Sequence, residues 1–143
     1  MPIIFHSEQP SFKLKNKTRI RHWLQNVVAQ HKGTIRCIQY IFCDDAYLLE
    51  INQQYLRHST LTDIITFRYE EFPHPLHSDI YISIERVKEN AVKFGVSFEL
   101  ELNRVLVHGV LHLLGYKDKS GEEKKKMRLA EDAALALWIN ESP

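Results

Sequence analysis

Two histidines four residues apart are the strongest chemical signal in the sequence. His108 and His112 lie in the apolar stretch 108–118, HGVLHLLGYKD, which is interrupted at Gly115. In a helix this spacing places both imidazoles on one face, one turn apart, as two ligands of a single metal ion require. Gly115 can take the left-handed conformation that ends a helix, so the chain can turn back and bring Asp118 towards the histidines as a third ligand.

Three protein ligands would make an open metal site. A structural zinc site usually closes its shell with four ligands rich in cysteine, whereas three ligands leave room for a water molecule that the metal can acidify. A carboxylate ligand is harder than an imidazole and carries charge, so it would loosen the preference of the site for zinc over other divalent metals. The alternative is that both histidines are ordinary core or surface residues with common hydrogen bonds.

The residue after the first histidine argues against one class of metalloenzyme. Metzincin proteases share the spacing of the two histidines but place a glutamate beside the first one as general base. That position is Gly109 here, and glycine can accept no proton. A small metallopeptidase is therefore the least favoured alternative.

Hydrophobic periodicity predicts the elements that must position these residues. Strands are expected where β-branched and aromatic residues gather, at 3–7, 34–43, 63–67 and 79–84. Helices are expected from about residue 15 to 31, after the aspartate pair at 44–45, over 84–94, from about 97 through the histidines, and from about 120 onwards. The histidine helix is apolar on nearly every face and must be buried. The order β-α-β-α-β-β-α-α-α indicates an α+β domain with one mixed sheet covered by helices, the last helix packing over the sheet.

Composition indicates an ordinary globular protein. A chain of 143 residues is long enough for one domain that spans residues 1–143. Because the formal net charge is only +1, attraction to nucleic acid would have to come from local basic patches. No apolar run reaches the roughly 18 residues of a membrane span, and the first ten residues lack the pattern of a signal peptide. We therefore expect a cytoplasmic protein with no membrane partner.

The histidine stretch is similar to the signature H-G-x-L-H-L-x-G-Y-D-H of the YbeY family of bacterial rRNA maturation factors. The matching residues are His108, Gly109, Leu111, His112, Leu113, Gly115 and Tyr116. Where the family has Asp-His, this chain has Lys117-Asp118, so an aspartate takes the place of the usual third histidine.

A second match extends the resemblance to about residues 47–132. It includes Asn52, Tyr55, residues 62–67 and residues 79–83. The family has an arginine after the tyrosine that is thought to take part in catalysis; it aligns with Leu56, and Arg57 follows one place later. The family's aspartate in this segment aligns with Ser59. We expect Arg57 to serve in place of the family arginine; the alternative is an exposed arginine at a helix end.

The resemblance implies a small, about four-stranded sheet packed with about five helices, with the metal site at the end of a buried central helix. It also implies a metal-dependent endoribonuclease that acts on single-stranded RNA, notably the 3′ end of small-subunit rRNA, and in ribosome quality control. The metal, expected to be one zinc ion or another divalent ion, would be bound by His108, His112 and Asp118.

The implied partners are rRNA or the ribosome, and ribosomal proteins. Lys117 and Lys119 flank the site and are expected to contact the RNA backbone, whereas the alternative is a solvated face of lysines. An alternative function is a ribosome-assembly or RNA-binding factor that holds a structural metal and cuts nothing.

Overall fold

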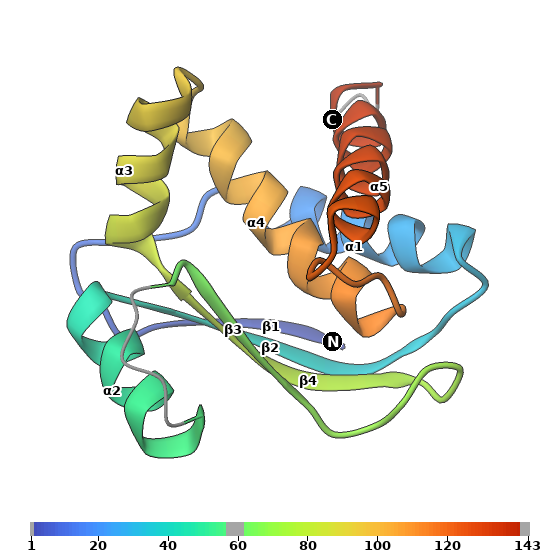
Figure 1. Cartoon of the computed structure of the whole chain (residues 1–143), viewed down its shortest axis with the longest axis horizontal. Coiled ribbons are helices and arrows are strands. Elements are labelled where there is room, and N and C mark those ends of the chain that lie inside the picture. The colour runs from blue at the N-terminus through green and yellow to red at the C-terminus, as the bar shows by residue number, and fades with distance from the viewer. Residues whose placement is uncertain (1, 57–61, 141–143) are drawn as a thin grey trace.

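Four strands form a single mixed sheet in the order β1-β2-β4-β3 (Figure 1). The structure is a computed structural model that describes residues 2–56 and 62–140. β1 (Ile3–Ser7), β2 (Ile35–Cys43) and β4 (Leu76–Ser83) run parallel, and β3 (Ile64–Arg68) pairs antiparallel with β4 at the sheet edge. The α+β class, the mixed four-stranded sheet and the order of the elements are all as expected from the sequence.

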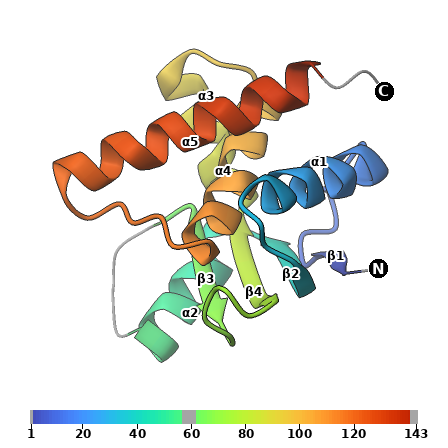
Figure 2. The same ribbon diagram turned by 90° about the vertical axis from the view of Figure 1, so that its right-hand side faces the viewer.

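The helices of the described chain lie on both sides of the sheet. α1 (Lys17–Gln30), α3 (Ile84–Phe94), α4 (Phe98–Leu113) and α5 (Gly121–Asn140) lie on one side, and α2 (Asp45–Leu56) lies on the other (Figure 1). α4 packs against β3 and β4, whereas α5 packs mainly on α4 and α1 (Figure 2). This placement corrects the expectation that the last helix packs over the sheet, because α4 and α1 already cover the apolar strand face.

Local signals set most of the element boundaries. Ser83 and Ser97 cap α3 and α4, since each hydroxyl accepts a hydrogen bond from the backbone N–H three residues on. Gly95 ends α3 in the left-handed conformation, with φ of 68°. β4 begins at Leu76, three residues before the predicted position, because Leu76 already pairs with Ile35 of β2. The predicted loop between the last two strands is correspondingly shorter.

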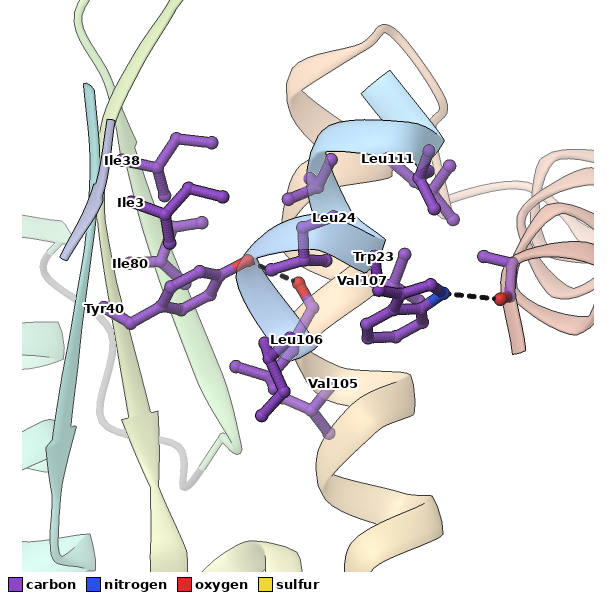
Figure 3. Close-up of a cluster of buried hydrophobic side chains, with 14 of the residues drawn as sticks. Ile3, Trp23, Leu24, Ile38, Tyr40, Ile80, Val105, Leu106, Val107 and Leu111 are labelled. Atoms are coloured by element: carbon purple, nitrogen blue, oxygen red, sulfur yellow. Dashed lines mark hydrogen bonds between the residues drawn. The ribbon is translucent and has the colours of Figure 1, made fainter. Parts of the chain in front are cut away.

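The main core lies between the sheet and the helices on the side that carries α1, α3, α4 and α5 (Figure 3). Two hydrogen bonds cross it. Tyr40 Oη donates to the Leu106 carbonyl at 2.8 Å, which ties β2 to α4, and Trp23 Nε1 donates to the Ala134 carbonyl at 2.7 Å, which ties α1 to α5. Because these groups are buried, leaving any of them unpaired would be costly, so the bonds fix the mutual positions of the elements.

α4 approaches the sheet closely at Gly109. A Cβ atom at this position would lie 3.1 Å from Ile64 Cδ1 on β3 and 3.1 Å from Ile80 Cδ1 on β4, which is tighter than ordinary van der Waals contact. The absence of a side chain therefore lets the histidine helix lie directly on these two strands.

Candidate metal-binding site

A cavity of about 660 Å³ lies between α2 and β3 on one side and α4 and α5 on the other, and His108, His112 and Asp118 all line it. The charged groups of its described lining, besides the histidines, are the carboxylates of Asp63, Glu101, Asp118 and Glu131 and the guanidinium groups of Arg104 and Arg128. Carboxylates thus outnumber arginines in this lining, which makes the cavity a favourable place for a cation.

The helix ends where the sequence predicts. Gly115 has φ of 109°, and the N–H of Tyr116 donates to the Leu111 carbonyl at 3.1 Å, as in a glycine-terminated helix. The chain then turns back, and Asp118 Oδ2 lies 3.3 Å from His108 Nε2. The expected approach of Asp118 to the first histidine is therefore present.

The same turn orients His112. Its Nδ1 lies 2.9 Å from the carbonyl oxygen of Tyr116. A carbonyl can only accept, so Nδ1 carries the hydrogen and, in the neutral ring, Nε2 keeps the lone pair that a metal needs. The hydroxyl of Tyr116 lies 3.1 Å from Nε2 of His31 at the end of α1, which anchors the turn to the rest of the domain.

A buried carboxylate orients His108. The Nδ1–H of His108 donates to Glu131 Oε2 at 2.7 Å, and Glu131, whose side chain is only 7% exposed, also accepts from Arg104 Nη1 at 2.9 Å. The second arm of Arg104 reaches Asp132 Oδ1 at 2.9 Å. Glu131 thus fixes the ring and leaves Nε2 directed at Asp118, which is how carboxylates support metal-ligating histidines.

The pKa values of this cluster reflect its burial and its charges. Burial disfavours the charged form of His108, but the hydrogen bond and charge of Glu131, with the nearby acids, outweigh burial and raise the pKa of His108. Burial also disfavours ionised Glu131, yet the bonds from His108 and Arg104 lower its pKa overall. Burial raises the pKa of Asp63, and burial with the charge of Asp63 raises the pKa of Glu101. A cation in the cavity would offset the cost of burying these carboxylates and the repulsion between Asp63 and Glu101.

The structure brings His108 and Asp118 together without assembling three ligands. The rings of His108 and His112 stack with their centroids 6.4 Å apart. Within residues 2–56 and 62–140, no group of three or more His, Cys, Asp or Glu side chains is arranged to hold a metal ion. The assignment of His108, His112 and Asp118 as one ligand set therefore stays a prediction.

Of the other predicted site residues, the structure describes the two lysines. Lys117 and Lys119 are exposed on either side of Asp118, outside the described lining of the cavity. Leu56, which aligns with the family arginine, lines the cavity. Arg57 lies outside the residues that the structure describes, as does Ser59, so the role of Arg57 stays a prediction.

Of the cavity residues that the sequence analysis did not single out, three carried a signal in the sequence. Glu101 and Arg104 precede His108 by seven and four residues, so the helical repeat places them on the histidine face. Glu131 follows the buried Met127 by four residues and is itself buried, on the inward face of α5. A charged residue at an apolar position of a helix therefore marked the partner of His108.

Comparison with known proteins agrees over nearly the whole chain. A family model described as "Endoribonuclease YbeY" matches residues 3–138. The Endoribonuclease YbeY of Flavobacterium psychrophilum is 53% identical over 127 residues, covering 89% of this chain and 90% of the relative. That of Cytophaga hutchinsonii is 46% identical over 135 residues, covering 94% of each protein.

A solved structure matches the fold as well. The solution structure of TM1509 from Thermotoga maritima superposes with a TM-score of 0.65 at 26% identity, covering 96% of this chain and 91% of that one. The sheet and helices described above are therefore similar to an experimentally determined fold.

Proposed function

The chain belongs to the endoribonuclease YbeY family and is a hydrolase, and we propose that it cuts single-stranded RNA in a metal-dependent reaction at the cavity beside α4. The observation that carries this proposal is the orientation of His108 by Glu131 and of His112 by the Tyr116 carbonyl. Both Nδ1 atoms are engaged, so each ring presents Nε2 as the atom for a metal ion, and that of His108 lies 3.3 Å from Asp118 Oδ2, the third proposed ligand.

The donor set fits a divalent cation. Two imidazole nitrogens and the Asp118 carboxylate are acceptable zinc ligands, and the excess of carboxylates in the lining favours positive charge. When bound, the ion would supply a Lewis acid and an acidified water molecule. We propose His108, His112 and Asp118 as its ligands; because one ligand is a carboxylate, other divalent ions are candidates beside zinc.

The chain's own groups have separate roles in the proposed reaction. Glu131 holds the proton on His108 Nδ1, so that ring stays in one orientation. Arg128 is exposed and lines the cavity, where a guanidinium can contact a phosphate oxygen. We propose that Lys117 and Lys119 attract the RNA backbone at the cavity edge, and that Arg57 contributes to stabilising charge on the phosphate.

Membership of the family supports a proposal for the cellular role. We propose that the substrate is the 3′ end of small-subunit rRNA and that the protein acts on the ribosome in the cytoplasm, in rRNA maturation and quality control, with ribosomal proteins as partners. In the described part of the chain, every helix is too short or too polar to span a membrane.

Metal content and RNA cleavage test the proposal together. Protein purified without chelators should carry about one divalent ion per chain, and Asp118→Ala should lose it. His112→Ala should abolish cleavage of a single-stranded RNA while keeping a cooperative unfolding transition. His22→Ala is the matched control, since His22 is exposed on α1, outside the cavity lining, and this variant should behave as wild type.

Two results would overturn the proposal. A wild-type protein that cuts RNA equally well with and without chelator would exclude a metal-dependent reaction. If His112→Ala bound RNA and cleaved it at the wild-type rate, the cavity would not be the active site.

A further inference from the structure

A second cavity, of about 350 Å³, lies on another face of α4. The first cavity, which is lined by His108, His112 and Asp118, is called the site pocket. The second cavity is enclosed by the segment 11–16 before α1, the first turns of α1 and α4, and Trp138 near the end of α5. Asn103 lines it and precedes His108 by five residues, which is about 140° around the helix. The two cavities therefore share α4 but open on different faces of it.

The walls of this second cavity are largely aromatic and aliphatic. The apolar lining residues are Phe12, Leu14, Ile20, Phe98, Leu102 and Trp138. A cavity of this size with an apolar wall is at the lower end of the range that small-molecule sites occupy. The walls thus suit a flat, apolar body.

One buried amide in this wall has no partner. Asn103 is only 2% exposed, and its Nδ2 makes no hydrogen bond to any described residue. Buried polar groups are nearly always hydrogen-bonded, and the cavity beside Asn103 offers space for a partner that the described chain does not supply. The missing partner must be a hydrogen-bond acceptor, because an amide nitrogen only donates.

The surroundings favour negative charge. Asn16 stands at the N-cap of α1, its side chain makes no capping hydrogen bond within the described chain, and the first turn of the 14-residue helix holds no acidic residue. The partial positive charge of this helix end is therefore not offset there. Lys13 and Lys15 also line the cavity. Its described lining residues include one acidic residue, Glu99, in the first turn of α4.

We propose that this cavity is a binding site for a small aromatic anion, whose ring system packs against Phe98 and Trp138. An acceptor atom of the ligand takes the hydrogen bond of Asn103 Nδ2, and its negative charge is attracted by Lys13, Lys15 and the N-terminus of α1. This site is separate from the proposed ribonuclease site and does not depend on it.

The fluorescent probe 8-anilinonaphthalene-1-sulfonate tests the site directly, because it is an aromatic anion that brightens in apolar surroundings. Titration into the full chain should show one site. In Asn103→Leu, which keeps the size of the side chain but removes the donor, the affinity should fall about tenfold, the factor that corresponds to one hydrogen bond to a charged group. Lys13→Gln, an exposed change that leaves the fold alone, should weaken binding several-fold.

Two controls identify the cause. N-phenyl-1-naphthylamine has the same rings without the sulfonate, and it should bind wild type and Asn103→Leu with equal affinity. Asn90→Leu makes the same substitution in the lining of the site pocket and should leave binding of the sulfonate unchanged. Asn103→Leu should melt no lower than wild type, since it removes an unpaired buried amide.

Three results would overturn the proposal. Failure of the sulfonate to bind wild type would show that the cavity is not a site for aromatic anions. Equal affinity for wild type, Asn103→Leu and Lys13→Gln would show that the amide and the lysine bind no ligand. Weaker binding to Asn90→Leu, with Asn103→Leu unaffected, would place the probe in the site pocket instead.

Discussion

Two arginine-centred networks in this protein use the same chemistry for different ends. In the first, Arg104 on α4 bridges Glu131 and Asp132 on α5, both at 2.9 Å. In the second, Arg86 on α3 bridges Asp45 on α2 and Glu89 on its own helix, both at 2.8 Å. Each network joins two helices through a guanidinium held between two carboxylates.

The two networks differ in one further partner. Glu131 in the first network and Asp45 in the second each also contact a group other than the arginine. Glu131 accepts from the ring of His108, which lines the site cavity, whereas Asp45 accepts from the hydroxyl of Ser83 at 2.6 Å, at the start of α3. Asp45 and Arg86 are outside the described lining of the cavity. An ion pair therefore gains a functional role from the group that it orients, and its strength alone does not show that role.

Removing the Glu131 carboxylate from the first network should have the largest effect on stability and on cleavage. Glu131→Ala removes one of the two carboxylates that contact Arg104 in the described chain, and it frees the ring of His108. We expect a loss of about 3 kcal/mol in the free energy of unfolding, at the low end for a broken buried pair. Metal affinity or cleavage should fall about 10–100-fold, as when other carboxylates behind metal-binding histidines are removed. Urea unfolding and RNA cleavage measure the two losses, and unchanged cleavage in a folded variant would refute the positioning role.

The matching change in the second network should affect stability alone. Asp45→Ala removes one partner of Arg86 and the acceptor of the buried Ser83 hydroxyl, so the free energy of unfolding should fall by about 2 kcal/mol. Cleavage at a temperature where the variant is folded should equal that of wild type. A large loss of cleavage would erase the distinction between the networks.

Acid should weaken the second network in a defined pH range. Burial alone would raise the pKa of Asp45, but its hydrogen bonds with Arg86 and Ser83 lower it below the ordinary 3.8. A carboxyl whose pKa is lower in the folded state adds stability above its unfolded pKa and loses it as pH falls through the folded value. Wild type should therefore be more stable than Asp45→Asn near neutral pH, with the difference shrinking below about pH 4. A difference that stays constant down to pH 2 would show that the charge of Asp45 contributes nothing.

A pair of conservative changes should give the smallest effects. Lysine cannot reach two carboxylates with two arms as arginine does, so Arg104→Lys and Arg86→Lys should each cost about 0.5–1 kcal/mol of stability. Only Arg104→Lys should slow cleavage, because Arg104 supports the carboxylate behind His108. Equal cleavage rates in the two variants would place Arg104 outside the chain of contacts that orients the ring.

Local signals made most of the fold predictable from the sequence. β1 and α3 have the bounds expected from strand-forming residues and from the stop at Gly95. The turn at Gly115, with Asp118 returning to His108, was likewise predictable, because a helix stop and a short loop are local features.

What escaped prediction depends on contacts between distant segments. Glu131 meets His108 across 23 residues, and the packing of α5 on α4 and α1 decides that meeting. Periodicity shows that Glu131 faces inward but not which group it faces. The same limit applies to Asn103, whose unpaired amide becomes apparent only once the segment 11–16 and Trp138 enclose it.

Gly109 also bears on how this fold can evolve. In metzincin proteases the corresponding position holds the catalytic glutamate, but here a Cβ atom would lie 3.1 Å from Ile64 Cδ1 and from Ile80 Cδ1, so both side chains would have to move by a few tenths of an ångström. A mutation to glutamate would also bring a charged side chain against Ile64 and the buried Ile80, so we expect it to lower stability. Close packing at one glycine is therefore a constraint on how the sequence beside the histidine pair can change.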